Sequence, residues 1–483
     1  MKVLVMGLGL HGGGLEAARY LLRHGADITV TDLRNERVLA PSIEKPNAAC
    51  GEAGRNTAAI RYVLGRHEIQ DFENADFVIK NPGVPPDSPF LQAAKRIETD
   101  ISLFLAASPA RLNAVTGTKG KSSTVSAIHW VLKLAHGGEK APFPAGKAYY
   151  GGNIAVSPLT FLDKLTATDD VTLELSSWQL GDLKDRLRDD GAPLLKPQAA
   201  ALTAIMSDHL DRYKTMDAYV ADKRIIYQGQ DENDFTIAGN DTWGRNFHAE
   251  SRGRPLVYSP APLEADAEGG WLTGPDGPGL VRLRHATPGL AAGRTVELVP
   301  AQLLIPGFHQ KRNMLAAGLV LLGLGLEPDF IREGLGSFSG LKHRLELFHQ
   351  TQGIEFYNDS AATIPESAAA AIDALGRDVP LTLVTGGTDK KLDFSPLVQA
   401  APLANKIILL AGSGSEKLAR LFDEAGIAYQ GPFDSLDRAV YAALENAVPG
   451  SRVALSPGCA SFGMFLNEFD RGDKWKAAVL RLV

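Results

Sequence analysis

Short apolar runs alternate with glycine-containing turns and amphipathic segments along the whole chain. Near the N-terminus, residues 3–6 form one such run, residues 15–24 have helical spacing, and residues 28–31 form a second run that ends at Asp32. A strand, a helix and a strand in this order are typical of a parallel sheet. The chain is therefore predicted to begin with an α/β domain, to which residues 77–80 add another strand.

The same alternation starts again twice further along. The second pattern has predicted strands at 112–116, 171–175 and 199–205, helices at 124–135, 219–228 and 313–324, and a glycine- and proline-rich hairpin region at about 252–300. The third has strands at 354–357, 381–385, 406–410 and 452–455, with helices at 415–425 and 435–447. We therefore predict three α/β domains in series, at residues 1–99, 100–340 and 341–483.

Composition narrows the class of protein. A chain of 483 residues fits two to four domains. With 50 basic and 56 acidic residues it has no electrostatic footprint for nucleic acid. The two cysteines, Cys50 and Cys459, form no disulfide framework, and no apolar stretch is long enough to cross a membrane. The short, glycine-broken start is unlike a signal peptide. We expect a protein of the cytoplasm without membrane insertion.

A glycine-rich segment at 117–122, read as G-T-K-G-K-S, lies between a predicted strand and a predicted helix. Glycines let backbone N–H groups face phosphate oxygens, and a helix N-terminus adds partial positive charge. Lys121 would reach the β- and γ-phosphates, and the Ser122 hydroxyl would bind magnesium. Val115 stands where the usual motif has its first glycine. The alternative, a serine-capped glycine turn, does not explain the flanking strand and helix.

A second glycine motif, G-x-G-x-x-G at 7–12, is followed about 25 residues later by Asp32. Alone it fits an NAD-dependent oxidoreductase, any nucleotide diphosphate, or a tight turn without a ligand. The oxidoreductase interpretation leaves the loop at 117–122 unexplained. A second nucleotide site in one chain favours a nucleotide-linked substrate at the first motif.

Polar residues that could bind a metal follow two strands of the central pattern. Glu174 closes one strand and His209 follows the next, so both would reach the edge where Ser122 lies. A carboxylate, an imidazole and a hydroxyl are plausible magnesium ligands, although histidine is unusual for so hard an ion. Lys223 lies on a predicted helix, where a solvated lysine is the expectation from the pattern alone.

Several motifs together resemble the Mur ligases of peptidoglycan synthesis, and among them the MurD type. In the central pattern these are GTKGKSS at 117–123, GGNIA at 151–155, ELSSWQL at 174–180 and DHLDRY at 208–213, with Lys223. In the last third they are GLKHR at 340–344, YNDSAAT at 357–363, Gly386-Gly387 with Lys390, and SPGCASF at 456–462. The resemblance covers nearly the whole chain in order.

The resemblance implies a UDP-binding Rossmann-like domain, a central P-loop ATPase domain and a C-terminal Rossmann-like domain that brings in the amino acid. It implies an ATP-dependent ligase that adds D-glutamate to UDP-N-acetylmuramoyl-L-alanine through an acyl phosphate, with two magnesium ions. Such a monomeric enzyme would serve cell-wall synthesis, cell shape and division. The alternatives are addition of L-glutamate, and a folylpolyglutamate-synthetase-like ligase, which the N-terminal nucleotide motif disfavours.

Site residues carried over from the resemblance fall into four groups. The UDP moiety would be bound by Leu10, His11, Asp32, Arg34, Asn81, Asn153, Ser176 and Gln179. ATP would be bound by Gly117, Thr118, Lys119, Gly120, Lys121, Ser122, Ser123, Asn313, Arg344 and Asp359. Metal would be bound by Ser122, Glu174, His209 and a carbamylated Lys223, with Lys121, Lys223 and His209 as the catalytic set. The amino acid would be bound by Thr363, Lys390, Ser461 and Phe462.

Two positions depart from the family pattern. Ala361 replaces the lysine usual in D-S-K-A-T, which removes a cation near the amino-acid site; Lys391 is the neighbouring residue that could compensate. Gln310 stands where asparagine is common and keeps the amide. The change at Ala361 leaves a non-catalytic nucleotide-binding protein as a further alternative, against which the retained phosphate and metal residues argue.

Overall fold

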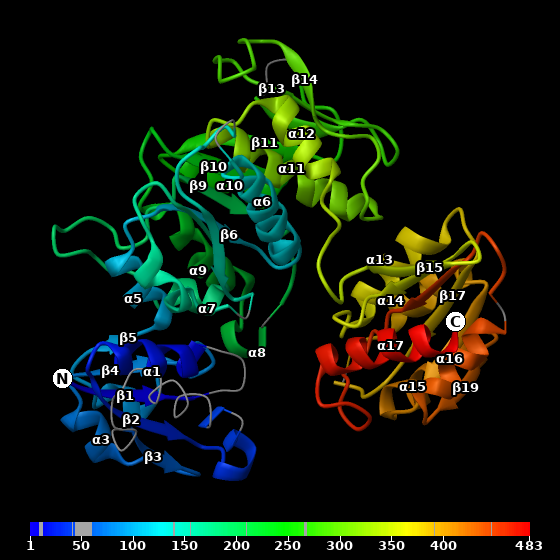
Figure 1. The fold of residues 1–483 in the computed structure, drawn as a ribbon, viewed down its shortest axis with the longest axis horizontal. Helices are drawn as coiled ribbons and strands as arrows, with labels where there is room; N and C mark the ends of the chain where they lie inside the picture. The colour runs from blue at the N-terminus through cyan, green and yellow to red at the C-terminus, as the bar shows by residue number, and fades with distance from the viewer. Residues whose placement is uncertain are drawn as a thin grey trace. The chain divides into compact units, whose positions relative to one another are not determined.

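The computed structural model describes residues 1–8, 13–40, 42–43, 60–138, 141–154, 156–208, 210–264, 268–390, 392–445 and 447–483 (Figure 1). Three β-sheets of five, nine and six strands, connected by helices, organise these residues. The chain forms two compact units. One contains the first two sheets (Met1–Gly274, Pro278–Val299 and Asn313–Leu335), and the other contains the third (Pro275–Gly277, Pro300–Arg312 and Gly336–Val483).

The first sheet is parallel, with strand order β3-β2-β1-β4-β5. Its strands are β1 (Lys2–Met6), β2 (Asp27–Asp32), β3 (Ile60–Leu64), β4 (Phe77–Lys80) and β5 (Ile97–Glu98), with helices α1 (Gly13–Arg23), α3 (Ile69–Asn74), α4 (Pro89–Gln92) and α5 (Asp100–Ala107). The neighbours of β1 are β2 and β4, so the C-terminal ends of these three strands lie at one edge of the sheet. The predicted strands 3–6, 28–31 and 77–80 are confirmed.

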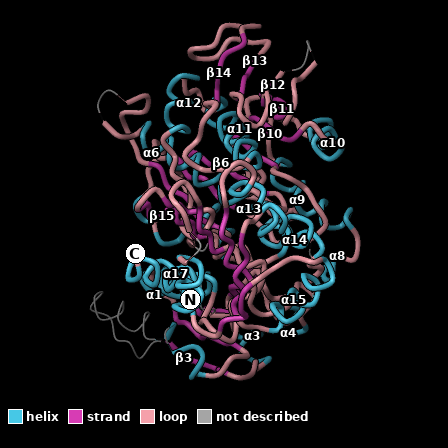
Figure 2. Tube along the Cα trace, turned by 90° about the vertical axis from the view of Figure 1, so that its right-hand side faces the viewer, coloured by secondary structure: helices cyan, strands magenta, loops and turns pink. Residues whose placement is uncertain are grey.

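The nine-stranded sheet has the order β14-β13-β12-β11-β10-β9-β6-β8-β7. Strands β6 to β12 are β6 (Arg111–Thr116), β7 (Ala148–Gly152), β8 (Asp170–Glu174), β9 (Ala199–Leu202), β10 (Phe235–Gly239), β11 (Arg254–Ser259) and β12 (Gly269–Leu272), which pair in parallel. β13 (Gly279–Arg282) and β14 (Thr295–Val299) add antiparallel pairs, as the predicted hairpin region indicated. Figure 2 shows β11 to β14 beside α11 (Phe308–Gly323) and α12 (Pro328–Gly336).

The other helices that follow strands of this sheet carry Lys121, Gln179 and Lys223 of the predicted site. They are α6 (Lys121–Ala135), α7 (Ser177–Gly181), α8 (Leu210–Tyr213), α9 (Met216–Gln228) and α10 (Thr242–Glu250), with short 3-10 turns η2 (Pro158–Thr160) and η3 (Leu162–Lys164). The predicted helices 124–135 and 219–228 are therefore confirmed, each with an earlier start.

The third sheet has the order β15-β16-β20-β17-β18-β19, parallel except for β15. Its elements are β15 (Glu346–Thr351), β16 (Ile354–Asn358), α13 (Pro365–Gly376), β17 (Leu381–Thr385), α14 (Ser395–Ala400), η4 (Ala401–Leu403), β18 (Lys406–Leu410), α15 (Ser413–Ala425), β19 (Gln430–Phe433), α16 (Leu436–Leu444), β20 (Arg452–Leu455) and α17 (Glu468–Leu482). Three α/β domains are thus the architecture that the sequence predicted.

One continuous core joins the first sheet to the central sheet. Val5, Ile79 and Phe104 belong to the same buried cluster as Leu159 and Leu173. Ion pairs and hydrogen bonds cross the same boundary, which is why these two domains form a single compact unit. The boundaries at residues 99 and 340 stay predictions. Among the described residues, no helix has the length and apolarity that crossing a bilayer requires.

Candidate active site

The phosphate loop connects β6 to α6, as the sequence predicted. Gly117 and Gly120 have φ of +143° and +92°, which side-chain-bearing residues rarely adopt. A Cβ on Gly117 would lie 1.9 Å from Thr203 Oγ1, and a Cβ on Gly120 would lie 2.3 Å from Asn313 Oδ1. Both positions therefore require glycine. The predicted ATP ligand Asn313 lies directly against this loop.

Lys121, the first residue of α6, turns its side chain back over the loop. Its Nζ donates to the carbonyl oxygens of Gly117 and Thr118, each at 3.0 Å. The Thr118 hydroxyl in turn bonds to the backbone of Met206 and lies 3.0 Å from the Tyr219 hydroxyl. A cation is thus held at a helix N-terminus by a loop that the neighbouring elements keep in shape, which is an arrangement suited to phosphate.

Glu174 ends β8 beside the phosphate loop, since its register partner on β6 is Val115. The side chain is 2% exposed. Its Oε1 accepts a hydrogen bond from Asn153 Nδ2 at 2.8 Å, whereas its buried Oε2 has no partner among the described residues. A buried carboxylate oxygen left unpaired is costly unless a cation satisfies it. Glu174 therefore fits the magnesium ligand that the sequence predicted.

The rest of the predicted metal set is only partly described. Ser122 is half-buried in the first turn of α6. His209 lies outside the described residues, as do Leu10, His11 and Lys391. The described part of the chain holds no group of three or more His, Cys, Asp or Glu side chains arranged for a metal. Asn153 donates to Glu174, which links it to the metal side of the site. Its predicted contact with the UDP moiety stays a prediction.

Lys223 is buried, and the expectation of a solvated helical lysine is wrong. It is 1% exposed on α9, and its Nζ donates to Gly117 O at 3.0 Å and to Thr116 Oγ1 at 3.4 Å. The ammonium also lies 4.5 Å from the centre of the Tyr219 ring. Burial, with the charge of Lys121 as a second cause, lowers the pKa of Lys223 to about 7. An amine that is substantially neutral near pH 7 can react with carbon dioxide.

The N-terminal edge brings together three of the predicted UDP residues, Asp32, Arg34 and Asn81. Asp32 accepts hydrogen bonds from the backbone N–H groups of Leu8 (3.0 Å, to Oδ2) and Arg34 (2.9 Å, to Oδ1), so it shapes the loops after β1 and β2. Asn81 packs against Gly7, where a Cβ would lie 3.0 Å from the Asn81 Cβ. The side chain of Arg34 is exposed at this edge.

Ser176 and Gln179 form a capping box at the start of α7. Gln179 N donates to Ser176 Oγ at 3.2 Å, and Gln179 Oε1 accepts from Ser176 N at 3.0 Å. Both side chains therefore satisfy the helix terminus, a structural role that the S-x-x-Q spacing signals and that the sequence analysis missed. Their predicted contact with the UDP substrate remains a prediction.

In the C-terminal unit, Asp359 follows β16 and is buried. Its Oδ1 accepts from Leu345 N at 3.1 Å, and its Oδ2 accepts from Ser456 Oγ at 2.7 Å. Burial raises the pKa of Asp359 to about 7, against the opposing charges of Arg344 and Arg471. Arg344 is exposed close to this carboxylate, so the two predicted ATP residues of this unit are neighbours.

The predicted amino-acid residues gather on adjoining loops. The backbones of Thr388 and Ala460 exchange two hydrogen bonds of 3.0 Å, the Thr388 hydroxyl donates to Phe462 O, and Lys390 Nζ lies 6.0 Å from the Phe462 ring centre. Ser461 is buried and Phe462 exposed. The turn that contains Ala361 and Thr363 adjoins this group, because Gly458 N donates to Ala362 O at 2.9 Å.

Arg471 of α17 is a further residue of this group, which the sequence analysis missed. It connects two of the loops through hydrogen bonds. The guanidinium is fully buried and donates to Ser360 Oγ (3.0 Å), Ser360 O (2.8 Å) and Cys459 O (3.1 Å). Its sequence signal is helical spacing, because Arg471 lies four residues before the buried Trp475 on α17.

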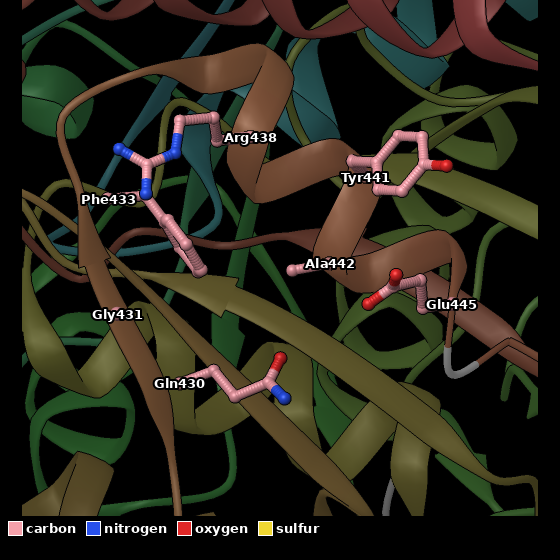
Figure 3. Close-up of a pocket in the computed structure, with 7 residues that line it drawn as sticks. All are labelled: Gln430, Gly431, Phe433, Arg438, Tyr441, Ala442 and Glu445. Carbon is pink, nitrogen blue, oxygen red and sulfur yellow. The ribbon is translucent and has the colours of Figure 1, made fainter.

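A shallow hollow of about 500 Å³ on the same unit is a different feature (Figure 3). It lies between β19 and α16, where the Arg438 guanidinium carbon is 5.4 Å from the Phe433 ring centre and Tyr441 is exposed. None of the predicted site residues lines it, so we do not assign the active site there.

Comparisons with known proteins cover the whole chain. The family models that match are Mur ligase MurD-like, N-terminal domain at 1–102, Mur ligase middle domain at 115–321, and Mur ligase, glutamate ligase domain at 343–459. The UDP-N-acetylmuramoylalanine--D-glutamate ligases of Treponema pallidum and Roseiflexus are each 38% identical, covering 99% of this chain and 97% and 98% of theirs. The UDP-N-acetylmuramate-alanine ligase MurC of Thermotoga maritima shares the fold (TM-score 0.60, 16% identity, all of both chains).

Proposed function

We infer that this chain, which belongs to the Mur ligase family and within it to the MurD type, is an ATP-dependent ligase that adds D-glutamate to UDP-N-acetylmuramoyl-L-alanine. The observation that carries the proposal is the pairing of two features at one sheet edge. These are the glycine loop with Lys121 held at the N-terminus of α6, and, beside it, the buried Glu174, one of whose oxygens is paired by no described residue. Hydride transfer to or from a nicotinamide cofactor requires neither of these two features.

The chemistry follows from these groups. The alanyl carboxylate attacks the γ-phosphorus of ATP, the bond to the β–γ bridging oxygen breaks, and ADP leaves. Lys121 offsets the charge that spreads over the transferred group. The glutamate amine then attacks the acyl carbon, and phosphate departs with one oxygen of the former carboxylate. Lys390 supplies a cation, and Ser461 a donor, for a carboxylate of the incoming amino acid.

Magnesium fits the donor set at Glu174. When bound, it would neutralise phosphate charge, held by Glu174 and Ser122, with His209 and a carbamylated Lys223 as further proposed ligands. The carbamate is supported by the burial of Lys223 and by its lowered pKa, because only the neutral amine adds to carbon dioxide. Participation of two ions, action in the cytoplasm and a monomeric state are part of the same proposal.

The test is phosphate release from ATP by the purified protein with UDP-N-acetylmuramoyl-L-alanine, magnesium, and D-glutamate, L-glutamate or no amino acid. We expect release that requires D-glutamate, and almost none from Lys121→Ala. Lys133→Ala, an exposed lysine on the same helix, is the matched control and should behave as wild type. Release only with L-glutamate would reassign the amino acid, and release without UDP substrate would refute the proposal.

A further inference from the structure

A buried ion pair joins the first domain to the central one. Lys80, the last residue of β4, is 3% exposed, and its Nζ lies 2.8 and 2.7 Å from the two carboxylate oxygens of Asp182. Burial lowers the pKa of Lys80 and raises that of Asp182. Because burying both charges offsets much of their attraction, such a pair is weak evidence for stability and better evidence for a fixed geometry.

On one side, the pair fixes the edge of the first sheet where the predicted UDP residues lie. Lys80 is the register partner of Met6, which leads into the first glycine motif. The next residue, Asn81, packs against Gly7. A shift of Lys80 therefore moves the backbone that carries Asn81.

On the other side, the pair fixes α7 against the helix that carries Lys223. Asp182 is the C-terminal cap of α7. The preceding Gly181 packs on Asp222 of α9, since a Cβ there would lie 2.6 Å from Asp222 Oδ2, and that carboxylate also accepts from the Tyr213 hydroxyl at 2.7 Å. Lys223 follows Asp222 directly, so α7 connects Lys80 to the phosphate-loop side of the site.

We propose that Lys80 is a positioning residue, which sets the span between the loops that hold the UDP end of the substrate and the central-domain groups that act on its carboxylate. The inference rests on the proposed function, because a nucleotide-linked acyl substrate extends across both regions. Other contacts join the same domains, including those of Arg186 with the Glu98 carboxylate and the Ile97 carbonyl oxygen. Loss of the Lys80 pair should thus loosen the span without separating the domains.

The test compares Lys80→Met with Arg23→Met. Arg23 also pairs across these two domains, with Asp163 at 3.4 Å, but both side chains are exposed. Lys80→Met should raise the KM for UDP-N-acetylmuramoyl-L-alanine about tenfold, while kcat and the KM for ATP stay within about twofold. Arg23→Met should change none of them. An unchanged KM for the UDP substrate with a lowered Tm would show a purely structural role and overturn the proposal.

Two further measurements keep the outcome decisive. Lys80→Arg retains the positive charge on a side chain of different length and shape, and it serves as the test if Lys80→Met fails to fold. It should raise the KM for UDP-N-acetylmuramoyl-L-alanine by about threefold. Calorimetric titration with UDP-N-acetylmuramoyl-L-alanine separates this proposal from the proposed function. If wild type does not turn over, a Kd about tenfold weaker in Lys80→Met still supports positioning, and an equal Kd, or no binding by wild type, overturns it.

Discussion

Gly120→Ala is the substitution for which the structure gives the sharpest expectation. The backbone at Gly120 has φ +92°, and left-handed conformations cost an alanine about 1–2 kcal/mol. In addition, the new Cβ would lie 2.3 Å from Asn313 Oδ1. Ordinary contact begins near 3.4 Å, so the amide or the loop must move by about 1 Å.

Gly325 provides a matched control for the backbone cost. Its φ is +91°, and a Cβ there would meet nothing within 4 Å. The backbone conformation alone should therefore cost both variants about 1–2 kcal/mol of stability, worth about 2–4 °C of Tm per kcal/mol. Only Gly120→Ala displaces a residue beside the phosphate loop, and a misplacement of about 1 Å can cost about 100-fold in rate.

The assay is steady-state phosphate release at varied ATP, with thermal unfolding of each variant alongside. We expect kcat/KM for ATP to fall about 100-fold in Gly120→Ala and to stay within about twofold of wild type in Gly325→Ala. If Gly120→Ala turned over ATP within about threefold of Gly325→Ala, the close approach of Asn313 to the loop would not matter for catalysis, and the reasoning would fail.

Three more predictions concern single groups. Glu174→Gln should lower turnover about 100-fold and raise the magnesium concentration needed for the half-maximal rate, which a metal titration measures. The control is Asp217→Asn, a substitution of an exposed residue on α9. An unchanged magnesium dependence would remove Glu174 from the metal site. Lys223→Ala should be nearly inactive and partly restored by short carboxylates such as formate, and full activity without rescue would exclude the carbamate. The carboxylate of Asp359, with a pKa of about 7, should give kcat/KM for ATP an acidic limb near pH 7. Ser456→Ala removes a hydrogen bond to the charged form, raises the pKa of Asp359 and should move that limb to higher pH; a limb at the same pH would show that another group titrates.

The parts of the site that local sequence could predict are those made within one strand–turn–helix unit. The phosphate loop is such a unit, because β6, Gly117, Gly120 and α6 are consecutive in the chain. Glu174 was predicted because strand ends in a parallel sheet meet at one edge. What made the family assignment specific was the order of several motifs over the whole chain.

The burial of charged side chains was not predicted from the spacing of apolar residues along single helices and strands. Lys223 lies on the same helix stripe as the buried Tyr219, Val220, Ile226 and Tyr227, so its spacing contained the signal, but its partners on the phosphate loop are more than 100 residues away in sequence. The Lys80–Asp182 pair is separated by 102 residues and depends on how two domains pack. Such contacts are set by tertiary structure rather than by local periodicity.

The most direct test of the central claim follows an oxygen label. UDP-N-acetylmuramoyl-L-alanine with both oxygens of its free carboxylate as oxygen-18 is incubated with ATP, magnesium and D-glutamate, and the phosphate and the nucleotide product are weighed by mass spectrometry. Ligation through an acyl phosphate predicts one oxygen-18 in each phosphate released and a product that has gained one glutamyl residue and retains one oxygen-18. Unlabelled phosphate with an unchanged nucleotide would mean that the protein merely hydrolyses ATP, and would contradict the account.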